Sequence, residues 1–419
     1  MKTRKVLIIN QCAGNKGDRS VLYNLLNLFD KHDNVEITVS TSNVSDWKDT
    51  FTDKTIKFVP WGWFINPNAD SSKRLKFLMI RIFRKLTYAL TRVTLINNLN
   101  SKFIGHLINP EFKKALQETD LVISTGGHHI TTILSKNAVS SQIFDLACSI
   151  IYKKKVVVWS QSIGPLDFDS NIDKKFVECI LSRLDSVFVR DERSIGIAEK
   201  FGCDSKNIHL TSETVLSLNK RIDNYNPIAN RKDRIGISIY STGNRTKIET
   251  DKYIEQVSQL IDYSYDKTKN EIVFLPMELK GSKGDDRWLI KKIIERSVNK
   301  NYCSIYDQDM NTYDHFKFIQ NCQYFIGHKT HSVIYALAAG TPLIALAYHP
   351  KTIDFMTQFE VEKYAIADTE LTKEKYISCF NDLVEEANFV GNKIYSKSKL
   401  LSQEIQIDFD RLIEENLYG

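Results

Sequence analysis

The residues best suited to chemistry lie in one stretch, from Phe325 to Pro342. An apolar run ends there in a glycine, a polar turn with two histidines and a lysine follows, and a second apolar run closes with Gly-Thr-Pro. This order predicts a strand, a turn and a helix. The turn would place Lys329 and His331 at the helix start, where backbone N–H groups and the helix dipole attract an anion. The stretch is therefore the first candidate for a functional site.

Polar turns follow other strand-like runs as well. Four of them are Asn15-x-Gly17-Asp18, Gly126-Gly127-His128-His129, Ser162-Ile-Gly-Pro165 and Arg190-Asp191. Short apolar runs alternate with helix-like segments in both halves of the chain, which predicts parallel strands covered by helices on both faces. Ligands of such sheets bind at the carboxyl ends of the strands, so we expect most of these turns to line a site.

The fold class that this alternation predicts is α/β, with two doubly wound, Rossmann-like domains facing a cleft. We expect the first domain over residues 1–218 and the second over 235–419, joined by a polar linker over 219–234 that contains Pro227. Strands are expected over 5–10, 35–40, 120–124, 155–160 and 186–189 in the first half, and over 234–239, 271–275, 324–327 and 343–347 in the second.

Composition restricts the class of protein. The chain has 419 residues, 42% of them apolar, with a mean hydropathy of −0.29, which is typical of a globular protein of about two domains. Its seven cysteines are dispersed without C-x-x-C spacing, which favours reduced thiols over a zinc site or a disulfide framework. The apolar run near the N-terminus is too short for a signal peptide, so a cytoplasmic location is expected.

The net charge of +6 is unevenly distributed. Residues 71–110 contain eight Lys or Arg residues and no acidic residue, and apolar residues recur at helical spacing over Lys73–Val93. A basic amphipathic helix of this kind suits an anionic membrane leaflet or a lipid-diphosphate acceptor. The alternative is a helix that packs on the first domain with a solvated basic face. No nucleic-acid recognition motif is present.

These motifs, in this order and spacing, resemble the polysaccharide pyruvyl transferase family. The most specific block is Ile326-Gly-x-x-x-His331-Ser, followed by Ala338-Ala-Gly340-x-Pro342 and Ala347-Tyr348-x-Pro350-Lys351. The resemblance covers nearly the whole chain and implies a GT-B-like fold. It also implies transfer of the enolpyruvyl carbons of phosphoenolpyruvate to a sugar diol as a ketal, in surface polysaccharide biosynthesis, with the saccharide carried on a lipid.

The resemblance and the polar turns together lead us to expect a role for each of these residues. His331 would be the acid that protonates the donor, and Asp18 a base or acceptor ligand. The donor residues would be Lys329, Ser332, Lys351, Tyr240, Arg245 and Thr330, and the acceptor residues Asn15, Gly17, Gly126, Gly127, His128 and Arg190. Phosphoenolpyruvate is then a co-substrate, and no cofactor is expected.

Each of these assignments has a structural alternative. His331 could cap its own helix, Asp18 could be an N-cap, and Arg190 could form a structural salt bridge with Asp191. The pair Asp285–Asp286 lacks a second acidic cluster, so we expect a solvated helix start there rather than a metal site.

Two other functions remain open for the chain as a whole. Lys329 and Tyr240 stand where the family usually has arginine, and lysine offers a phosphate only a point charge. This favours a GT-B glycosyltransferase that uses a nucleotide-activated sugar as the main alternative. A protein that has lost activity and serves as a scaffold for glycan assembly is the other.

Overall fold

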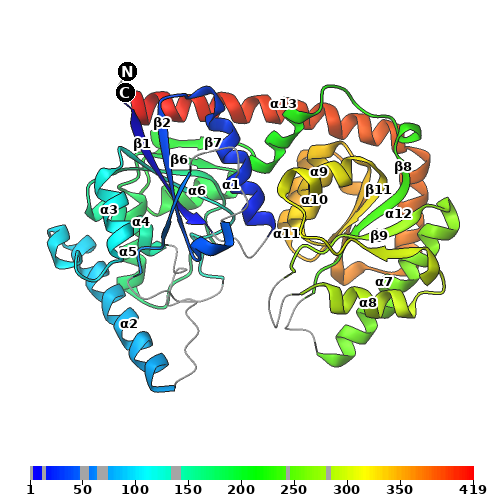
Figure 1. Cartoon of the computed structure of the whole chain (residues 1–419), viewed down its shortest axis with the longest axis horizontal. Helices are drawn as coiled ribbons and strands as arrows, with labels where there is room; N and C mark the ends of the chain where they lie inside the picture. The colour runs from blue at the N-terminus through cyan, green and yellow to red at the C-terminus, as the bar shows by residue number, and fades with distance from the viewer. Residues whose placement is uncertain are drawn as a thin grey trace. The chain divides into compact units, whose positions relative to one another are not determined.

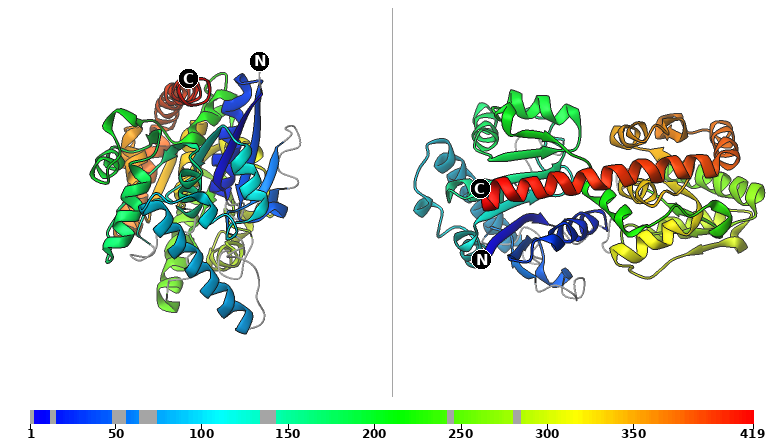
Figure 2. Two further views of the ribbon diagram at one scale, coloured as in Figure 1. Left: turned by 90° about the vertical axis from the view of Figure 1, so that its left-hand side faces the viewer. Right: turned by 90° about the horizontal axis from the view of Figure 1, so that it is seen from above.

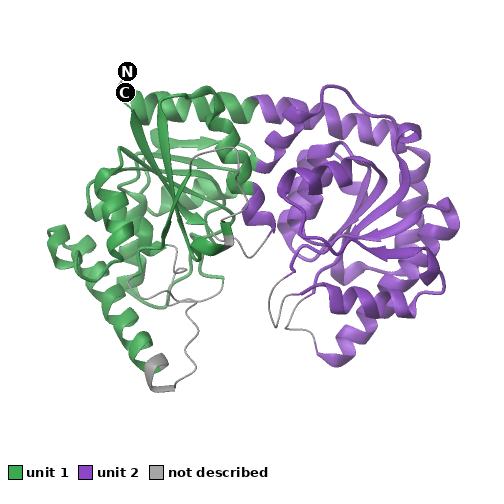
Figure 3. Cartoon of the chain, viewed as in Figure 1, with its two compact units in different colours: residues 1–13, 21–214, 404–419 green, residues 14–20, 215–403 purple. Residues whose placement is uncertain are grey.

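The computed structural model describes residues 3–11, 16–47, 56–63, 74–133, 143–241, 246–279 and 285–419. The chain divides into two compact units (Figure 3): unit 1 comprises residues 1–13, 21–214 and 404–419, and unit 2 comprises 14–20 and 215–403. This division differs from the predicted one at three segments. Residues 14–20 and 215–218 belong with unit 2, which also includes the predicted linker 219–234, and residues 404–419 belong with unit 1.

Unit 1 contains one parallel sheet of seven strands in the order β3-β2-β1-β4-β5-β6-β7 (Figure 1). The strands are β1 (Arg4–Gln11), β2 (Val35–Thr41), β3 (Lys57–Pro60), β4 (Leu121–Thr125), β5 (Lys155–Gln161), β6 (Ser186–Val189) and β7 (Ile208–Leu210). The helices that begin in this half are α1 (Lys16–Leu28), α2 (Arg74–Ile96), α3 (Pro110–Glu118), α4 (Ile143–Ile151), α5 (Asn171–Leu181) and α6 (Glu192–Lys200).

Unit 2 contains a second parallel sheet, of six strands in the order β10-β9-β8-β11-β12-β13. Its strands are β8 (Lys232–Ser238), β9 (Glu271–Phe274), β10 (Cys303–Ile305), β11 (Cys322–Gly327), β12 (Leu343–Ala347) and β13 (Ala365–Ala367). The helices of this half are α7 (Lys247–Thr268), α8 (Arg287–Arg296), α9 (Thr312–Gln320), α10 (Thr330–Ala339), α11 (Pro350–Gln358), α12 (Lys373–Glu385) and α13 (Ala387–Ile413).

Each sheet is covered by helices on both faces (Figure 2), as the apolar runs predict. Every residue of β4 and of β12 is buried, because a central strand in such a sheet has no solvent-facing side. The two units are therefore Rossmann-like α/β domains, and the predicted fold class is confirmed. Within the described residues, no helix is both long and apolar enough to cross a membrane.

The end of α13 belongs with unit 1 because an aromatic residue anchors it there. Phe409 is fully buried and meets the rings of Phe29 and Trp159 at centroid distances of 4.8 and 5.2 Å. The side-chain amide of Gln406 also donates to the carbonyl oxygen of Leu28 at 3.3 Å. These contacts join residues 250 to 380 positions apart, which no local sequence pattern can reveal.

A buried carboxyl group organises the centre of unit 1. Asp145, in the first turn of α4, accepts hydrogen bonds from the backbone N–H of Gly62 at 3.0 Å and from the hydroxyl of Ser40 at 3.1 Å. It thereby joins α4 to the ends of β2 and β3. Burial raises the pKa of this carboxyl group to about 7, although the two hydrogen bonds act in the opposite direction.

The raised pKa of Asp145 predicts a pH-dependent stability. Between about pH 4 and pH 7 the unfolded chain releases this proton and the native protein retains it, so the free energy of unfolding falls by about 1.4 kcal/mol per pH unit. Asp145→Asn removes the ionisation, so its stability relative to the parent protein should rise with pH across this window. Thermal unfolding of both proteins at several pH values measures the difference, and parallel profiles would contradict the assignment.

Candidate active site at the carboxyl edge of the second sheet

The carboxyl ends of the strands in unit 2 bring five connecting segments together. The strands β8, β11, β12 and β13 are neighbours in the sheet, and β9 lies beside β8. The turn between β11 and α10 lies at the centre of this edge. The backbone N–H of His328 donates to the carbonyl oxygen of Ser238 at 3.1 Å, which extends the pairing of β11 with β8 beyond Gly327. The sequence prediction of a strand, a turn and a helix here is confirmed.

His328 is fully buried within this turn, held by two polar partners. Its Nδ1 atom lies 2.7 Å from the hydroxyl of Tyr253, and its Nε2 atom lies 3.2 Å from a carboxylate oxygen of Asp368. The backbone N–H of Tyr240 donates to the same Tyr253 hydroxyl at 3.3 Å, so that hydroxyl can donate to Nδ1. Nδ1 then accepts, and Nε2 is the ring atom that faces Asp368.

Two tyrosines form an aromatic stack over this histidine. The rings of Tyr240 and Tyr348 lie 3.9 Å apart at 19°, and each lies about 6 Å from the His328 ring. Burial raises the pKa of Tyr348, which keeps its hydroxyl protonated. Tyr240 was predicted as a donor ligand. The stack gives it a defined orientation at the same edge of the sheet.

Lys329 projects into a buried cluster of acidic residues. Its ammonium group lies 3.0 and 3.1 Å from the carboxylate oxygens of Asp286 and 3.2 Å from Glu278. Asp286 is fully buried and also accepts from the backbone N–H groups of Met277 and Glu278 and from the hydroxyl of Ser241, at 2.6–3.0 Å. The prediction of a solvated helix start at Asp286 is therefore wrong, because four donors make its burial favourable.

The first turns of two helices meet beside this cluster. Thr330 begins α10, Thr352 lies at the start of α11, and their hydroxyls are 2.8 Å apart. Lys351 is half-buried at the start of α11, and Ser332 is fully buried with its hydroxyl donating to the carbonyl oxygen of Lys329 at 2.7 Å. The N-terminal ends of two helices thus meet here, and the dipole at such an end favours an anion.

His331 is packed against Gly17. A Cβ atom at position 17 would lie 2.4 Å from the Cγ and Nδ1 atoms of the imidazole, which leaves room for glycine alone. Asp18, also a predicted catalytic residue, is the third residue of α1 and is half-buried. The structure therefore brings Gly17 and His331 into contact within unit 2, although they are more than 300 positions apart in the chain.

The sequence analysis missed two cations next to Gly17. Lys16 and Arg19, in the first turn of α1, both pair with Asp309, at 3.6 and 3.1 Å. Burial lowers the pKa of Lys16, and the nearby charge of Asp309 opposes this shift. Both cations lie at a helix start, where the dipole disfavours them, and this unusual placement was the signal available in the sequence.

The acceptor residues predicted in unit 1 lie at the carboxyl edge of the first sheet. Gly127 accepts from the backbone N–H of Ser162 at 3.3 Å, and His128 makes a hydrogen bond with the carbonyl oxygen of Gly164, so these two turns are joined. Gly126 has a φ of +100°, a value that favours glycine. Asn15 and Arg245, also predicted as ligands, lie outside the described residues.

Arg190 forms a buried ion pair, but not with its neighbour in the chain. Its guanidinium group pairs with Glu213 and donates to the hydroxyl of Ser162 at 3.0 Å. Asp191 instead caps α6, accepting from the backbone N–H of Ser194 at 2.9 Å. The predicted Arg190–Asp191 salt bridge is replaced by this pair, because the side chains of adjacent residues diverge at the strand end.

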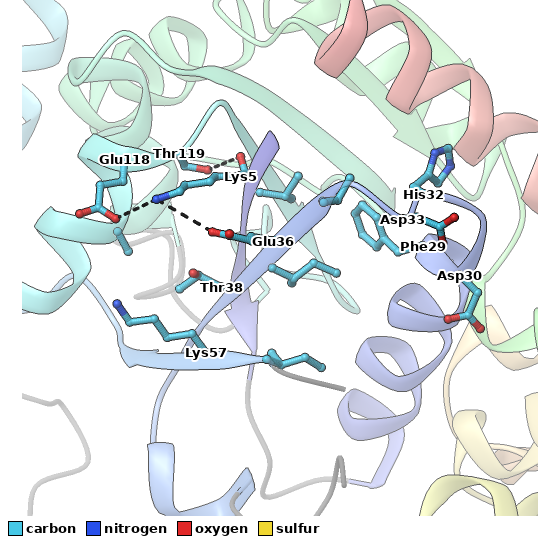
Figure 4. A pocket seen from close by; sticks show the side chains of 15 residues that line it. Lys5, Phe29, Asp30, His32, Asp33, Glu36, Thr38, Lys57, Glu118 and Thr119 are labelled. Carbon is cyan, nitrogen blue, oxygen red and sulfur yellow. Dashed lines mark hydrogen bonds and ion pairs between the residues drawn. The ribbon is translucent and has the colours of Figure 1, made fainter. Parts of the chain in front are cut away.

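A separate hollow of about 780 Å³ lies at the opposite edge of the first sheet (Figure 4). It is lined by residues at the amino ends of β1, β2 and β3, and Lys5 forms ion pairs there with Glu36 and Glu118 at 4.0 and 3.4 Å. None of the predicted site residues lines it. Ligands of parallel α/β sheets bind at the carboxyl edge, so we do not assign the chemistry to this hollow.

Comparison with known proteins agrees with the motifs. A model of the polysaccharide pyruvyl transferase family matches residues 15–350. The chain belongs to this family. It is also similar to the amylovoran biosynthesis protein AmsJ of Erwinia amylovora, with 22% identity over 93% of this chain and 98% of that protein. Membership makes the chain a transferase of polysaccharide biosynthesis.

Solved structures with the same fold include several that bind uridine nucleotides. UDP-GlcNAc 2-epimerase from Neisseria meningitidis, bound to UDP-GlcNAc, has a TM-score of 0.58 at 12% identity and covers 98% of this chain and 100% of its own. The Anabaena protein Alr3699/HepE in complex with UDP has a TM-score of 0.54 at 11% identity, with 100% of both chains covered. At such low identity these neighbours establish the GT-B-like fold alone.

The contact between Gly17 and His331 predicts that alanine destabilises the protein at position 17 but not at position 127. Gly17→Ala forces a methyl group into the imidazole, which should destabilise the protein by about 1–3 kcal/mol and shift the NMR signals of the His331 ring. Gly127→Ala is the matched control, since nothing lies within 4 Å of its Cβ position. Equal effects of the two changes on thermal unfolding and on the ring signals would contradict the contact.

The buried pair of Lys329 and Asp286 predicts that removing the lysine alone destabilises the protein more than removing both charges. Lys329→Met leaves a buried carboxylate without its cation and should cost about 3–5 kcal/mol in the free energy of unfolding. The double variant Lys329→Met/Asp286→Asn should regain most of that, because the amide oxygen can still accept from the backbone. Urea unfolding measures both.

The exposed pair of Lys363 and Glu386, 2.8 Å apart, provides the control for this experiment. Lys363→Met should change stability little, because water screens that pair. A Lys329→Met protein as stable as Lys363→Met would show that the buried pair does not form.

Proposed function

We propose that this protein transfers a pyruvyl group from phosphoenolpyruvate to two hydroxyls of a saccharide, forming a ketal and releasing phosphate. The observation that carries the proposal is the convergence of the α10 and α11 starts beside Lys329 and Lys351, with His331 in the first turn of α10. That arrangement suits a trianionic donor next to a proton source. The family match over residues 15–350 supports the same reaction.

The proposed reaction assigns one proton transfer to His331. The protonated imidazole adds a proton to the methylene carbon of phosphoenolpyruvate, which becomes the methyl group of the product. The cation formed at the neighbouring carbon takes the first sugar hydroxyl, the C–O bond to phosphate breaks, and the second hydroxyl closes the ketal. Of the two hydroxyl protons, one restores the imidazolium and the other leaves with phosphate, so the enzyme is unchanged.

Glu278 gives Lys329 a partner that a donor can replace. Asp286 is fully buried and satisfied by several donors, whereas about a third of the Glu278 side chain is exposed. A phosphate that enters beside Lys329 would displace Glu278 and leave Asp286 in place. Lys329 then contributes to donor binding without losing the contact that positions it.

For the acceptor we propose a saccharide carried on a lipid at the inner face of the membrane. The joined turns at Gly127 and Ser162, and the buried pair of Arg190 and Glu213, supply polar groups at the carboxyl edge of the first sheet. Hydroxyl-rich ligands are recognised by groups of this kind. Asp18, in the first turn of α1, is the residue we propose as the base that takes the proton of one attacking hydroxyl and passes it to the departing phosphate, which regenerates the carboxylate.

One observation keeps a nucleotide-sugar glycosyltransferase as the second candidate. Lys329 is committed to two carboxylates, and structural neighbours are described as bound to UDP or UDP-sugars. In this alternative the same helix starts would bind the diphosphate, and the Tyr240–Tyr348 stack would lie at a position suited to a base.

The experiment incubates the purified protein with phosphoenolpyruvate and a lipid-linked saccharide and measures phosphate release and the mass of the saccharide. We expect phosphate and a pyruvyl mass increment in equal amounts. His331→Ala should lower kcat about 10²- to 10⁴-fold, the usual contribution of a general acid. His106→Ala, an exposed histidine in unit 1, is the control and should be unaffected.

Two further measurements distinguish the candidates. Donor at a hundredfold excess over its Kd should stabilise the protein by about 2.7 kcal/mol, so thermal shifts with phosphoenolpyruvate and with UDP identify the ligand. Glu278→Gln should lower the KM for phosphoenolpyruvate, because the competing carboxylate charge is removed. Stabilisation by UDP alone, with no consumption of phosphoenolpyruvate, would overturn the proposed donor.

A further inference from the structure

The helix α2 presents its apolar residues to solvent and its threonines to the protein. Thr87, Thr91 and Thr94 are buried, and over residues 78–96, where the side chains of the helix are described, Leu95 is the only fully buried apolar residue. The exposed apolar side chains form a stripe mostly at i, i+4 spacing: Leu78, Met79, Ile82, Leu86, Leu90 and Val93. Water is an unfavourable environment for such a stripe, so the arrangement indicates that something apolar covers it.

The inverted orientation is fixed by specific contacts on the protein side. The guanidinium of Arg84 lies 5.0 Å from the Trp63 ring centroid, and Arg92 pairs with Asp173 of α5. Tyr88 meets Phe176 of α5 edge-to-face at 5.6 Å. A rotation of α2 that buried the leucines would break these contacts. Figure 1 shows α2 beside α4 and α5, with its first turns extending beyond them.

The charge around the stripe has one sign. Arg81 and Lys85 are exposed, one helical turn apart, and each directly precedes an exposed apolar residue, Ile82 or Leu86. No acidic residue occurs anywhere in residues 71–110. The surface therefore combines an apolar stripe with flanking cations. A surface that matches both features is an anionic membrane, which has acyl chains next to negatively charged headgroups.

We propose that α2 docks unit 1 on an anionic membrane surface. The stripe enters the boundary between headgroups and acyl chains, while Arg81 and Lys85 remain at the level of the lipid phosphates. The helix lies in the plane of the membrane and does not cross it. Its apolar stripe is thereby removed from water at a surface where a lipid-carried saccharide would be presented.

A second copy of this chain is a poorer occupant of the same surface. A two-fold contact through the stripe would bring Arg81 and Lys85 of both copies to one interface. No acidic residue of the segment would be available to pair with them. Like charges across an interface cost free energy, whereas an anionic bilayer satisfies both the charge and the apolar side chains.

The test is flotation of the full-length protein with lipid vesicles, without any donor, so its outcome is independent of the proposed chemistry. Vesicles of phosphatidylcholine and phosphatidylglycerol should bind the protein, and pure phosphatidylcholine vesicles should bind it much more weakly. Ile82→Ser/Leu86→Ser should abolish binding. Arg81→Gln/Lys85→Gln should weaken it about fivefold per charge removed and reduce its dependence on salt.

The controls use exposed apolar residues elsewhere. Ile172→Ser and Ile407→Ser lie on α5 and α13 and should bind like the parent protein. All of these positions are exposed, so circular dichroism should show unchanged folding. Equal binding to neutral and anionic vesicles, no binding to either, or a concentration-dependent dimer that Ile82→Ser/Leu86→Ser dissociates would each overturn the proposal.

Discussion

The geometry of the candidate site depends on the burial of one carboxylate. Asp286 has no exposed surface, and four donors from the segments after β8, β9 and β11 converge on it. A buried charge without partners would cost several kcal/mol, so these segments must stay in register with one another. The ion pair fixes Lys329, and Lys329 is the residue from which α10 begins. His331 follows Lys329 by two residues in the first turn of α10, so its position depends on where this helix begins.

The two histidines near the start of α10, His328 and His331, have different environments. His328 is enclosed by Tyr253, Asp368 and two further tyrosine rings, so its ring is held by fixed partners. That suits an internal positioning role, in which the ring braces the ends of β8, β11 and β13. His331 meets Gly17, a residue without a side chain, so its ring contacts backbone.

Much of the fold follows from local patterns, and the exceptions share a physical cause. Strands β1, β5, β6 and β12 lie within one residue of their predicted ranges, because their apolar runs are bounded by glycine or polar turns. Strands β7, β10 and β13 have three residues each at or near sheet edges, too few for a recognisable period. Residues 404–419 pack in unit 1 through Phe409, whose contact with Phe29 cannot be predicted from sequence spacing.

Positions in the candidate site could be predicted where the residue type and its motif determine the local structure. They could not be predicted where burial depends on hydrogen-bond partners from distant segments. The position of His331 at a helix start followed from the motif. An acidic pair is usually solvated, however, and the burial of Asp286 required donors from three strand ends.

The partners of Lys329 could not be predicted from the sequence. Its ammonium group makes two hydrogen bonds to Asp286 and an ion pair with Glu278. An arginine would keep spare donors for a phosphate. Lys329 is thus already paired with two carboxylates, of which Glu278 is the more exposed.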